Sequence, residues 1–271
     1  MKLNKKIFEA IDDTGTPDMK YYAFDWDDNI MSMPTQVLTV DEDGDEVGIS
    51  TEDFAEYRTI IGKEPFEYDG HIIVGFADKP FKFFRVEGDK QFIVDSMIAK
   101  PGPAWPDFVE SINNGSVFAI ITARGHTPSI IKEACYNLII SNHNGIDSEQ
   151  LLRNLEKYRE LAGEDLGDKV RMIREYLDLC RFYPVSYGEG SLTNPEEGKV
   201  KALIEFIEYV KKISTFIGKK VKLKNKISNN FLPTIGFSDD DIRNVETIKQ
   251  HFKDEPILKT YSTAGGIKRI Y

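Results

Sequence analysis

The sequence predicts an α/β fold built on a doubly wound, mostly parallel sheet. Apolar runs of strand length alternate with helix-periodic segments between residues 100 and 252, and this alternation is typical of parallel strands joined by helices. A further apolar run, Tyr21 to Phe24, is followed by the carboxylates Asp25 and Asp27. Ligands of such sheets bind beyond the carboxyl ends of the strands. We therefore expect Asp25 and Asp27 to lie in a crevice at the edge of the sheet.

A change of pattern divides the chain into two parts. From residue 31 to 99 the apolar runs are shorter and glycines separate them, and Lys100-Pro101-Gly102-Pro103 then marks a return to the α/β pattern. The length fits either one α/β domain with an insertion or two domains, and we expect the former. The prediction is a Rossmann-like core formed by residues 1–30 and 100–271, with residues 31–99 as an inserted α+β cap subdomain.

The local pattern specifies the elements of the first hundred residues. A short amphipathic helix is expected at 3–12, and the first strand at 20–25. One helix is expected in the insertion, at 51–61, with acidic residues in its first turn. The other short runs are expected to be strands, at 36–40, 71–76, 81–86 and 91–95. The acidic stretch 41–52 partly imitates a calcium-binding loop, but Glu46 occupies the position of its glycine, so we expect a hairpin turn.

The elements of the second part follow one another regularly. Thr127-Pro128 and Asn194-Pro195 each place a capping side chain before a proline, as at helix starts. The expected helices lie at 105–112, from 128 to about 141, within 146–180, from 195 onward and at 242–252. The expected strands lie at 117–121, 182–187 and 231–237.

Composition excludes several classes of protein. The chain of 271 residues is 41% hydrophobic and 30% charged, and it has no apolar run approaching the roughly 20 residues that span a bilayer. Its first residues lack the apolar segment and cleavage site of a secretory signal. We expect a cytoplasmic protein that does not bind membranes. Cys135 and Cys180 are expected to be buried thiols, although the sequence leaves a disulfide between them open.

Positive charge gathers in one segment of an acidic chain. The net charge of −10 argues against a general nucleic-acid binder. Nine lysines and only two acidic residues nevertheless lie between Lys199 and Lys226. A solvated helix face followed by a basic loop explains this segment most simply, and a surface that binds a polyanionic substrate is the alternative.

Four groups of polar residues stand at expected strand ends or helix starts. In chain order they are Asp25 with Asp27, Thr122, Lys199, and Asp239 with Asp240. Taken singly, each has a structural explanation as a turn, a cap or an exposed helix charge. Lys199 is preferred to Lys201 because it stands closer to the helix start, near the strand ends.

Taken together, the four groups resemble the motifs of the haloacid dehalogenase-type (HAD) phosphohydrolase superfamily. The resemblance covers residues 20–29 and 115–252. Asn29 departs from it, because threonine is commoner at that position. Three consecutive aspartates leave the register of the last motif open, but the stretch from Asp239 to Val245 resembles the family form DDxxxNV. That form favours Asp240 as a direct metal ligand, with Asp239 as a ligand or its partner.

The resemblance implies a Mg²⁺-dependent phosphatase that hydrolyses a phosphomonoester through an aspartyl phosphate. Asp25 would be the nucleophile and Asp27 the general acid and base. Thr122 would donate a hydrogen bond to the phosphoryl group, and Lys199 would offset its charge. All-oxygen ligands suit Mg²⁺. The implied ligands are Asp25, Asp27 through its backbone carbonyl, Asp239 and Asp240.

Other functions remain open. A phosphotransferase or mutase would use the same core, and a polynucleotide end-processing phosphatase would also use the lysine segment. A non-catalytic HAD-like binding module would keep the fold without needing Asp27. We expect a small phosphomonoester as the partner in preference to nucleic acid. Arg124 and His126, close to Thr122, are either substrate contacts or surface-loop residues, and the sequence indicates neither the substrate nor the oligomeric state.

Overall fold

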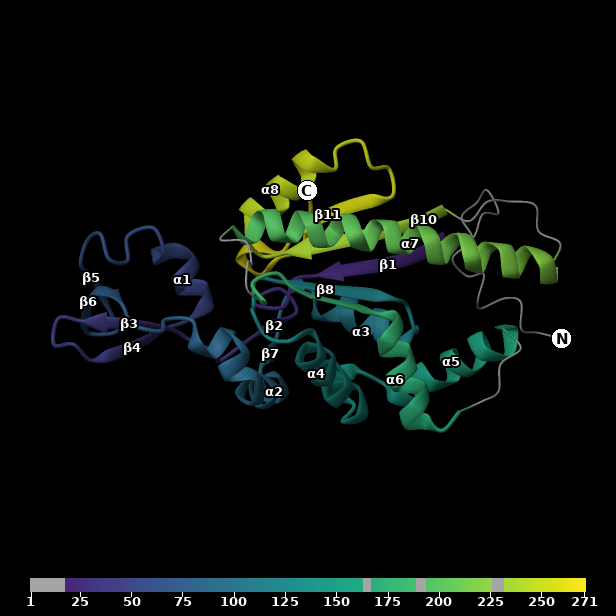
Figure 1. Ribbon diagram of the computed structural model, residues 1–271, viewed down its shortest axis with the longest axis horizontal. Helices are drawn as coiled ribbons and strands as arrows, with labels where there is room; N and C mark the ends of the chain where they lie inside the picture. Colours follow the sequence, from purple (N-terminus) through teal and green to yellow (C-terminus); the bar gives the residue numbers. More distant parts are fainter. Residues whose placement is uncertain (1–17, 163–166, 189–193, 226–231) are drawn as a thin grey trace.

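The computed structural model describes residues 18–162, 167–188, 194–225 and 232–271. The helix expected at 3–12 lies outside these described residues. The chain forms a six-stranded sheet with helices on both faces, and a smaller sheet stands to one side (Figure 1). Five of the six main strands are parallel, and one edge strand is antiparallel. The prediction of an α/β fold with a mostly parallel sheet is confirmed.

The main sheet places its most apolar strands at the centre. From one edge to the other it contains β12 (Arg269–Ile270), β11 (Leu258–Ser262), β10 (Leu232–Asp239), β1 (Asp18–Phe24), β8 (Phe118–Thr122) and β9 (Arg181–Pro184). The chain adds β8 and β9 on one side of β1, and then crosses over to add β10 and β11 on the other side. The strand order therefore reverses between β1 and β10, and in open α/β sheets ligands bind beyond the carboxyl ends of the strands at such a point.

Helices cover the sheet on both faces because successive strand residues point in opposite directions. Phe24 and Ile120 pack with one group of helices, whereas Ala23 and Ile121 pack with another. The first group is α2 (Asp89–Ile98), α3 (Trp105–Asn113), α4 (Pro128–Ile140), α5 (Ser148–Ala162) and α6 (Lys169–Leu179). The second is α7 (Pro195–Asn225) and α8 (Ile242–His251). Within the part of the chain that is described, no helix has the length and apolar character that crossing a membrane requires.

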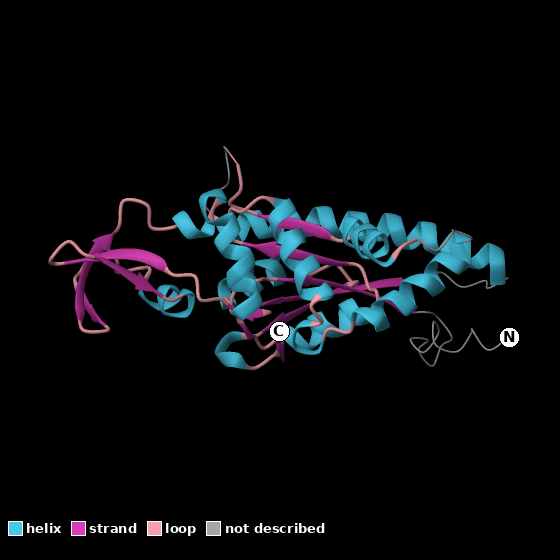
Figure 2. Cartoon of the chain, turned by 90° about the horizontal axis from the view of Figure 1, so that it is seen from below, coloured by secondary structure: helices cyan, strands magenta, loops and turns pink. Residues whose placement is uncertain are grey.

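The smaller lobe is formed by residues 37–76. It contains an antiparallel sheet and the expected helix α1 (Thr51–Tyr57), and it stands apart from the main body (Figure 2). Its strands, in spatial order, are β4 (Glu46–Ile49), β3 (Val37–Asp41), β6 (His71–Phe76) and β5 (Phe66–Tyr68). A tight turn joins β3 and β4, in which Asp41 accepts hydrogen bonds from the backbone amides of Asp43 and Asp45. The first part of the acidic stretch, residues 41–45, is thus a hairpin turn, as expected, whereas its remainder lies in β4 and at the start of α1.

Residues 81–95 differ from the prediction. The strands expected at 81–86 and 91–95 are wrong, because the structure has two 3₁₀ turns there, Lys82–Phe84 and Val86–Gly88, followed by α2. In α2 the polar Asp95 is buried and the apolar Ile98 is exposed. An apolar stripe is the signal that identifies a helix in a sequence, and α2 does not carry one.

The base of the insertion is packed into the main body. Two short strands, β2 (Met31–Ser32) and β7 (Lys100–Pro101), pair where the chain leaves and re-enters the core. Phe92 of α2 belongs to the same hydrophobic cluster as the core residues Phe108 and Phe118. Cys135 and Cys180 also lie in this cluster, and both are free thiols. The lobe of residues 37–76 therefore stands outside the core, whereas α2 is part of it.

Gly198 allows α7 to approach the end of β9, and this contact can be tested. A Cβ atom at position 198 would lie 2.7 Å from Cβ of Val185, so Gly198→Ala must displace the first turn of α7. Overpacking of this kind costs about 1–3 kcal/mol, against a gain in helix propensity of about 1 kcal/mol. We expect Gly198→Ala to lower the thermal unfolding midpoint, measured by circular dichroism. Lys201→Ala, at an exposed position of the same helix, is the control, and an equal or higher midpoint for Gly198→Ala would contradict the close packing.

Candidate active site

The residues after β1 form a tight loop at the edge of the sheet. The backbone amide of Asp25 donates to the carbonyl of Ser238 at 3.0 Å, so Asp25 still lies beside β10. The amides of Ile30 and Met31 then both donate to the carbonyl of Trp26, which closes the loop. Asp28 has a φ of 50°, a left-handed conformation that aspartate tolerates better than most residues. The chain therefore reverses direction directly after the two carboxylates of the first motif.

Asn29 ties this loop to two neighbouring strands. Its Nδ2 donates to the carbonyl of Asp25 at 3.0 Å and to the carbonyl and Oγ of Ser238 at 3.1 and 3.0 Å. Its Oδ1 accepts from the hydroxyl of Thr263, just beyond β11, at 2.9 Å. The Asn29 side chain is fully buried. Asn29 thus joins the loop to the ends of β10 and β11.

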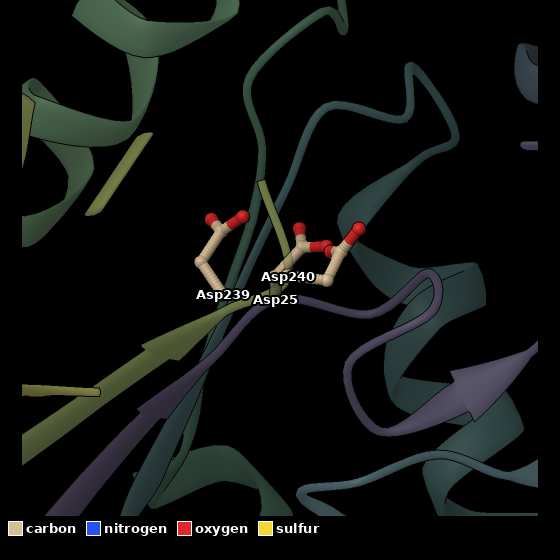
Figure 3. Close-up of side chains that lie close together, drawn as sticks. All are labelled: Asp25, Asp239 and Asp240. Carbon is tan, nitrogen blue, oxygen red and sulfur yellow. The ribbon is translucent and has the colours of Figure 1, made fainter. Parts of the chain in front are cut away.

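Three carboxylates converge where the strand order reverses. Asp25 follows β1, and Asp239 and Asp240 stand at the end of β10. The pairing of Phe24 with Ser238 sets the two strand ends level with each other. One ligand atom from each carboxylate lies within 4.8 Å of the others, and the side chains project beyond the strands (Figure 3). The structure therefore brings together three of the residues that the sequence proposed as metal ligands.

Lys199 lies among these carboxylates. Its Nζ donates to Oδ1 of Asp25 at 2.8 Å and to Oδ2 of Asp239 at 2.6 Å, and its side chain is only 2% exposed. Asp239 also accepts from the amide of Asp241 and from Nδ2 of Asn244. Lys199 belongs to the first turns of α7, as the capped start of that helix predicted. Its ammonium group thus neutralises part of the buried negative charge.

The pKa values show that this neutralisation is incomplete. Burial raises the pKa of Asp25 to about 8 although Lys199 opposes the rise, and the nearby Asp239 and Asp27 add to it. Burial, together with Asp239 and Asp25, raises the pKa of Asp240 well above its usual range. Burial disfavours the ammonium form of Lys199, but the two carboxylates outweigh it and raise its pKa. Three carboxylates against one ammonium leave the cluster short of positive charge.

The cluster fits a hard divalent cation such as Mg²⁺. Its donors are all carboxylate oxygens, which Mg²⁺ prefers, and a second positive charge would reduce the repulsion that raises the pKa values. Both oxygens of Asp239 already accept hydrogen bonds, from Lys199 and Asn244, whereas Lys199 binds Asp25 through Oδ1, so Asp25 and Asp240 are the more available ligands. Asp241 lies outside the cluster, because it caps α8 through the amide of Arg243. Its position favours the register in which Asp239 and Asp240 form the acidic pair.

Asp27 lies in different surroundings. Its carbonyl accepts from the amide of Asn29, and its carboxylate is held by Arg124. Nε and Nη2 of Arg124 donate to the two Asp27 oxygens at 2.8 and 2.7 Å. Arg124 and His126 are both buried, so they are not surface-loop residues. The pairing of Asp27 with Arg124 could not be read from the sequence, although both residues stand just beyond strand ends.

Thr122 lies at the carboxyl edge of the sheet, whereas most of the lysine segment leads away from it (Figure 1). Thr122 is the buried last residue of β8, and its Oγ1 accepts from the amide of Arg124 at 3.2 Å. The lysine segment was expected to be a helix followed by a basic loop. In the structure α7 continues to Asn225, so the segment is helical up to that residue. At 1.5 Å per residue, Lys219 lies about 30 Å along this helix from Lys199. The helix leads away from the carboxylates toward the other end of the molecule (Figure 1).

No family model, curated protein or solved structure matches this chain.

The role of Asn29 can be tested by its removal. Asn29→Ala would leave the carbonyl of Asp25 and the hydroxyl of Thr263 without this partner, and each buried group left unpaired costs about 1–3 kcal/mol. We expect the free energy of unfolding in urea to fall by at least about 2 kcal/mol. Asn113→Ala is the matched control, because Asn113 also bridges backbone groups but does so at the surface. Equal losses in the two variants would argue against the proposed anchor.

Proposed function

We propose that the protein is a Mg²⁺-dependent phosphatase of the HAD type, which hydrolyses a phosphomonoester through an aspartyl phosphate. The observation that supports this proposal most strongly is the convergence of Asp25, Asp239 and Asp240, the first two of which bind Lys199. These residues come from three distant parts of the chain, and they meet at the reversal of strand order where ligands bind.

The first step would transfer the phosphoryl group to Asp25. Lys199 holds Oδ1 of Asp25, which leaves Oδ2 to attack phosphorus. As the new P–O bond forms, the bond from phosphorus to the substrate oxygen breaks, and Asp27 gives its proton to the departing oxygen. The products are a free alcohol and an aspartyl phosphate.

The second step would regenerate the enzyme. Asp27, now a carboxylate, takes a proton from a water molecule while the water oxygen attacks phosphorus. The bond between phosphorus and Asp25 breaks, and inorganic phosphate and the free carboxylate result. Using one residue as the acid and then as the base divides a difficult hydrolysis into two easier steps.

Other groups would stabilise the phosphoryl oxygens. Lys199 can share its charge with them, and the Thr122 hydroxyl keeps its hydrogen for donation because its oxygen accepts from the amide of Arg124. Held by Asp25, Asp240 and Asp239, Mg²⁺ would offset the negative charge of the carboxylates and of the phosphate.

The insertion would act as a cap that shapes the substrate pocket. Arg58 at the end of α1 lies 3.8 Å from Glu196 of α7 and 3.9 Å from Asp241 at the start of α8. Asp28 of the active-site loop is hydrogen-bonded to the side chain of Thr51 in α1. The lobe of residues 37–76 therefore meets the core beside the carboxylates, where it could contact the leaving group.

The alternatives receive less support from the geometry. A polynucleotide end-processing phosphatase would need the lysine segment at the site, and α7 carries most of it away. Phosphotransferase chemistry would use the same residues and is distinguished by adding alcohol acceptors. A binding module would not turn over any substrate, so a panel of phosphomonoesters with and without Mg²⁺ separates it from an enzyme.

We expect Asp25→Asn to abolish hydrolysis of an activated aryl phosphate, because an amide is a poor nucleophile. General acid and base catalysis contributes about 10²–10⁴-fold, so Asp27→Asn should reduce turnover by about that factor. Steady-state assays with MgCl₂ measure both, and Asp43→Asn in the exposed hairpin is the matched control. Normal turnover by Asp25→Asn would refute its role as the nucleophile.

Metal binding can be tested without turnover. A cation whose free concentration is about 100 times its dissociation constant stabilises a protein by about 2.7 kcal/mol. MgCl₂ should therefore raise the unfolding midpoint of the wild type. We expect Asp240→Asn to lose most of this gain and Asp241→Asn to keep it, as judged by differential scanning fluorimetry. If MgCl₂ changes the unfolding midpoints of the two variants by the same amount, Asp240 does not bind the cation in preference to Asp241.

A further inference from the structure

Arg124 is a buried charge whose hydrogen bonds are almost all committed. Its side chain is 1% exposed. Two of its N–H groups bind Asp27, a second N–H of Nη2 donates to Oγ1 of Thr35 at 3.1 Å, and Nη1 lies 3.2 Å from Nε2 of His126. A guanidinium has five N–H donors, so only one is left over. Arg124 is thus poorly placed to bind a substrate phosphate with the fork of donors that such contacts normally use.

The insertion encloses the guanidinium. The Arg124 guanidinium carbon lies 4.6 Å from the centre of the Phe84 ring and 5.0 Å from that of Phe92. Both rings come from the part of the insertion that packs into the main body. Contacts of this kind between a cation and an aromatic face are strongest where water is excluded. The rings therefore restrict the guanidinium to one place.

His126 contacts Arg124 at a third nitrogen, Nη1. Because a guanidinium can only donate, Nε2 of His126 must accept, and the ring proton is then on Nδ1. Nδ1 accordingly donates to Asp89, the first residue of α2, at 2.8 Å. Burial and the charge of Arg124 lower the pKa of His126, in agreement with this neutral tautomer. The imidazole therefore connects Arg124 to α2.

Thr35 makes a second connection to α2. Its hydroxyl donates to Oδ2 of Asp95 at 3.1 Å, so its lone pairs face Nη2 of Arg124. The other oxygen of Asp95 accepts from Gln91 at 2.7 Å. Hydrogen bonds thus run without interruption from α2 through Thr35 and Arg124 to the carboxylate of Asp27.

We propose that Arg124 is the positioning residue of Asp27, and that α2 and Thr35 of the insertion hold Arg124 in place. This inference rests on the proposed function, in which Asp27 transfers protons. A bidentate pair fixes both the position and the plane of a carboxylate, and proton transfer requires hydrogen-bond distance to the reacting oxygen. A proton on Asp27 still leaves lone pairs for the guanidinium, so the pair persists through both steps. The insertion therefore supports the catalytic acid in addition to covering the substrate.

The test compares two substrates with leaving groups of different basicity. The ratio kcat/KM reports the steps up to formation of the aspartyl phosphate, and only a poor leaving group requires the proton of Asp27. For Arg124→Met we expect a loss of about 10²-fold or more with an alkyl phosphate, and of less than about tenfold with an activated aryl phosphate. Arg124→Lys keeps the charge but cannot bind both oxygens in one plane, so its losses should be intermediate.

Arg174→Met is the matched control. Arg174 also pairs with a carboxylate, Glu133, and stacks on an aromatic ring, Tyr136, but it belongs to α6. Its removal should change neither rate by more than about twofold. Equal losses with both substrates in Arg124→Met and Arg124→Lys would overturn the proposal, since a structural or phosphate-binding role predicts that result.

A crystal structure of Arg124→Lys provides a test that does not depend on activity. The proposal predicts that the Asp27 carboxylate rotates or becomes disordered, and an unchanged Asp27 would overturn it. If the wild type hydrolyses neither substrate, the proposed phosphatase function fails, and the crystal structure still decides whether Arg124 positions Asp27.

Discussion

The concentration of buried negative charge at the ends of β1 and β10 is the constraint on which the rest of this structure depends. Charges removed from water are costly unless they are paired, and here three carboxylates share one ammonium group. Several features of the fold serve this arrangement. Asn29 holds the loop that carries Asp25, Asn244 binds Asp239, and Gly198 lets α7 approach closely enough to deliver Lys199. The remaining deficit of positive charge explains why the site fits a divalent cation.

The two aspartates of the first motif lie two residues apart but have different electrostatic surroundings. Asp25 belongs to the cluster that lacks positive charge, whereas Asp27 is bound by the guanidinium of Arg124. Enzymes that use two carboxylates in different roles separate them in this way, through their environments. In the proposed mechanism the nucleophile Asp25 must be ionised, and a cation held beside it would offset the burial that raises its pKa.

The insertion has two parts with different relations to the core. The lobe of residues 37–76 stands apart and touches the core through Arg58 and Thr51, whereas α2 is packed into the main hydrophobic cluster. Under the proposed function, the first part would contact the substrate, and the second would hold the proton-transferring Asp27 in place through Arg124. A single inserted segment would then contribute both to substrate selection and to the geometry of the reaction.

The sequence by itself determined most elements of the main sheet and several of the polar residues at its carboxyl edge. Apolar periodicity and capping residues act over a few positions, so β1, α1, α3, β8, α4 and α7 could be predicted, together with Asp25, Thr122, Lys199 and Asp239 at their ends. Helix α2 could not be predicted, because its buried residues include polar ones, and β11 and β12 lie in short segments that were not predicted as strands. The pairing of Asp27 with Arg124 and the direction of the lysine segment were decided only by the tertiary structure. Each of these depends on contacts between residues far apart in the chain, and local patterns do not specify such contacts.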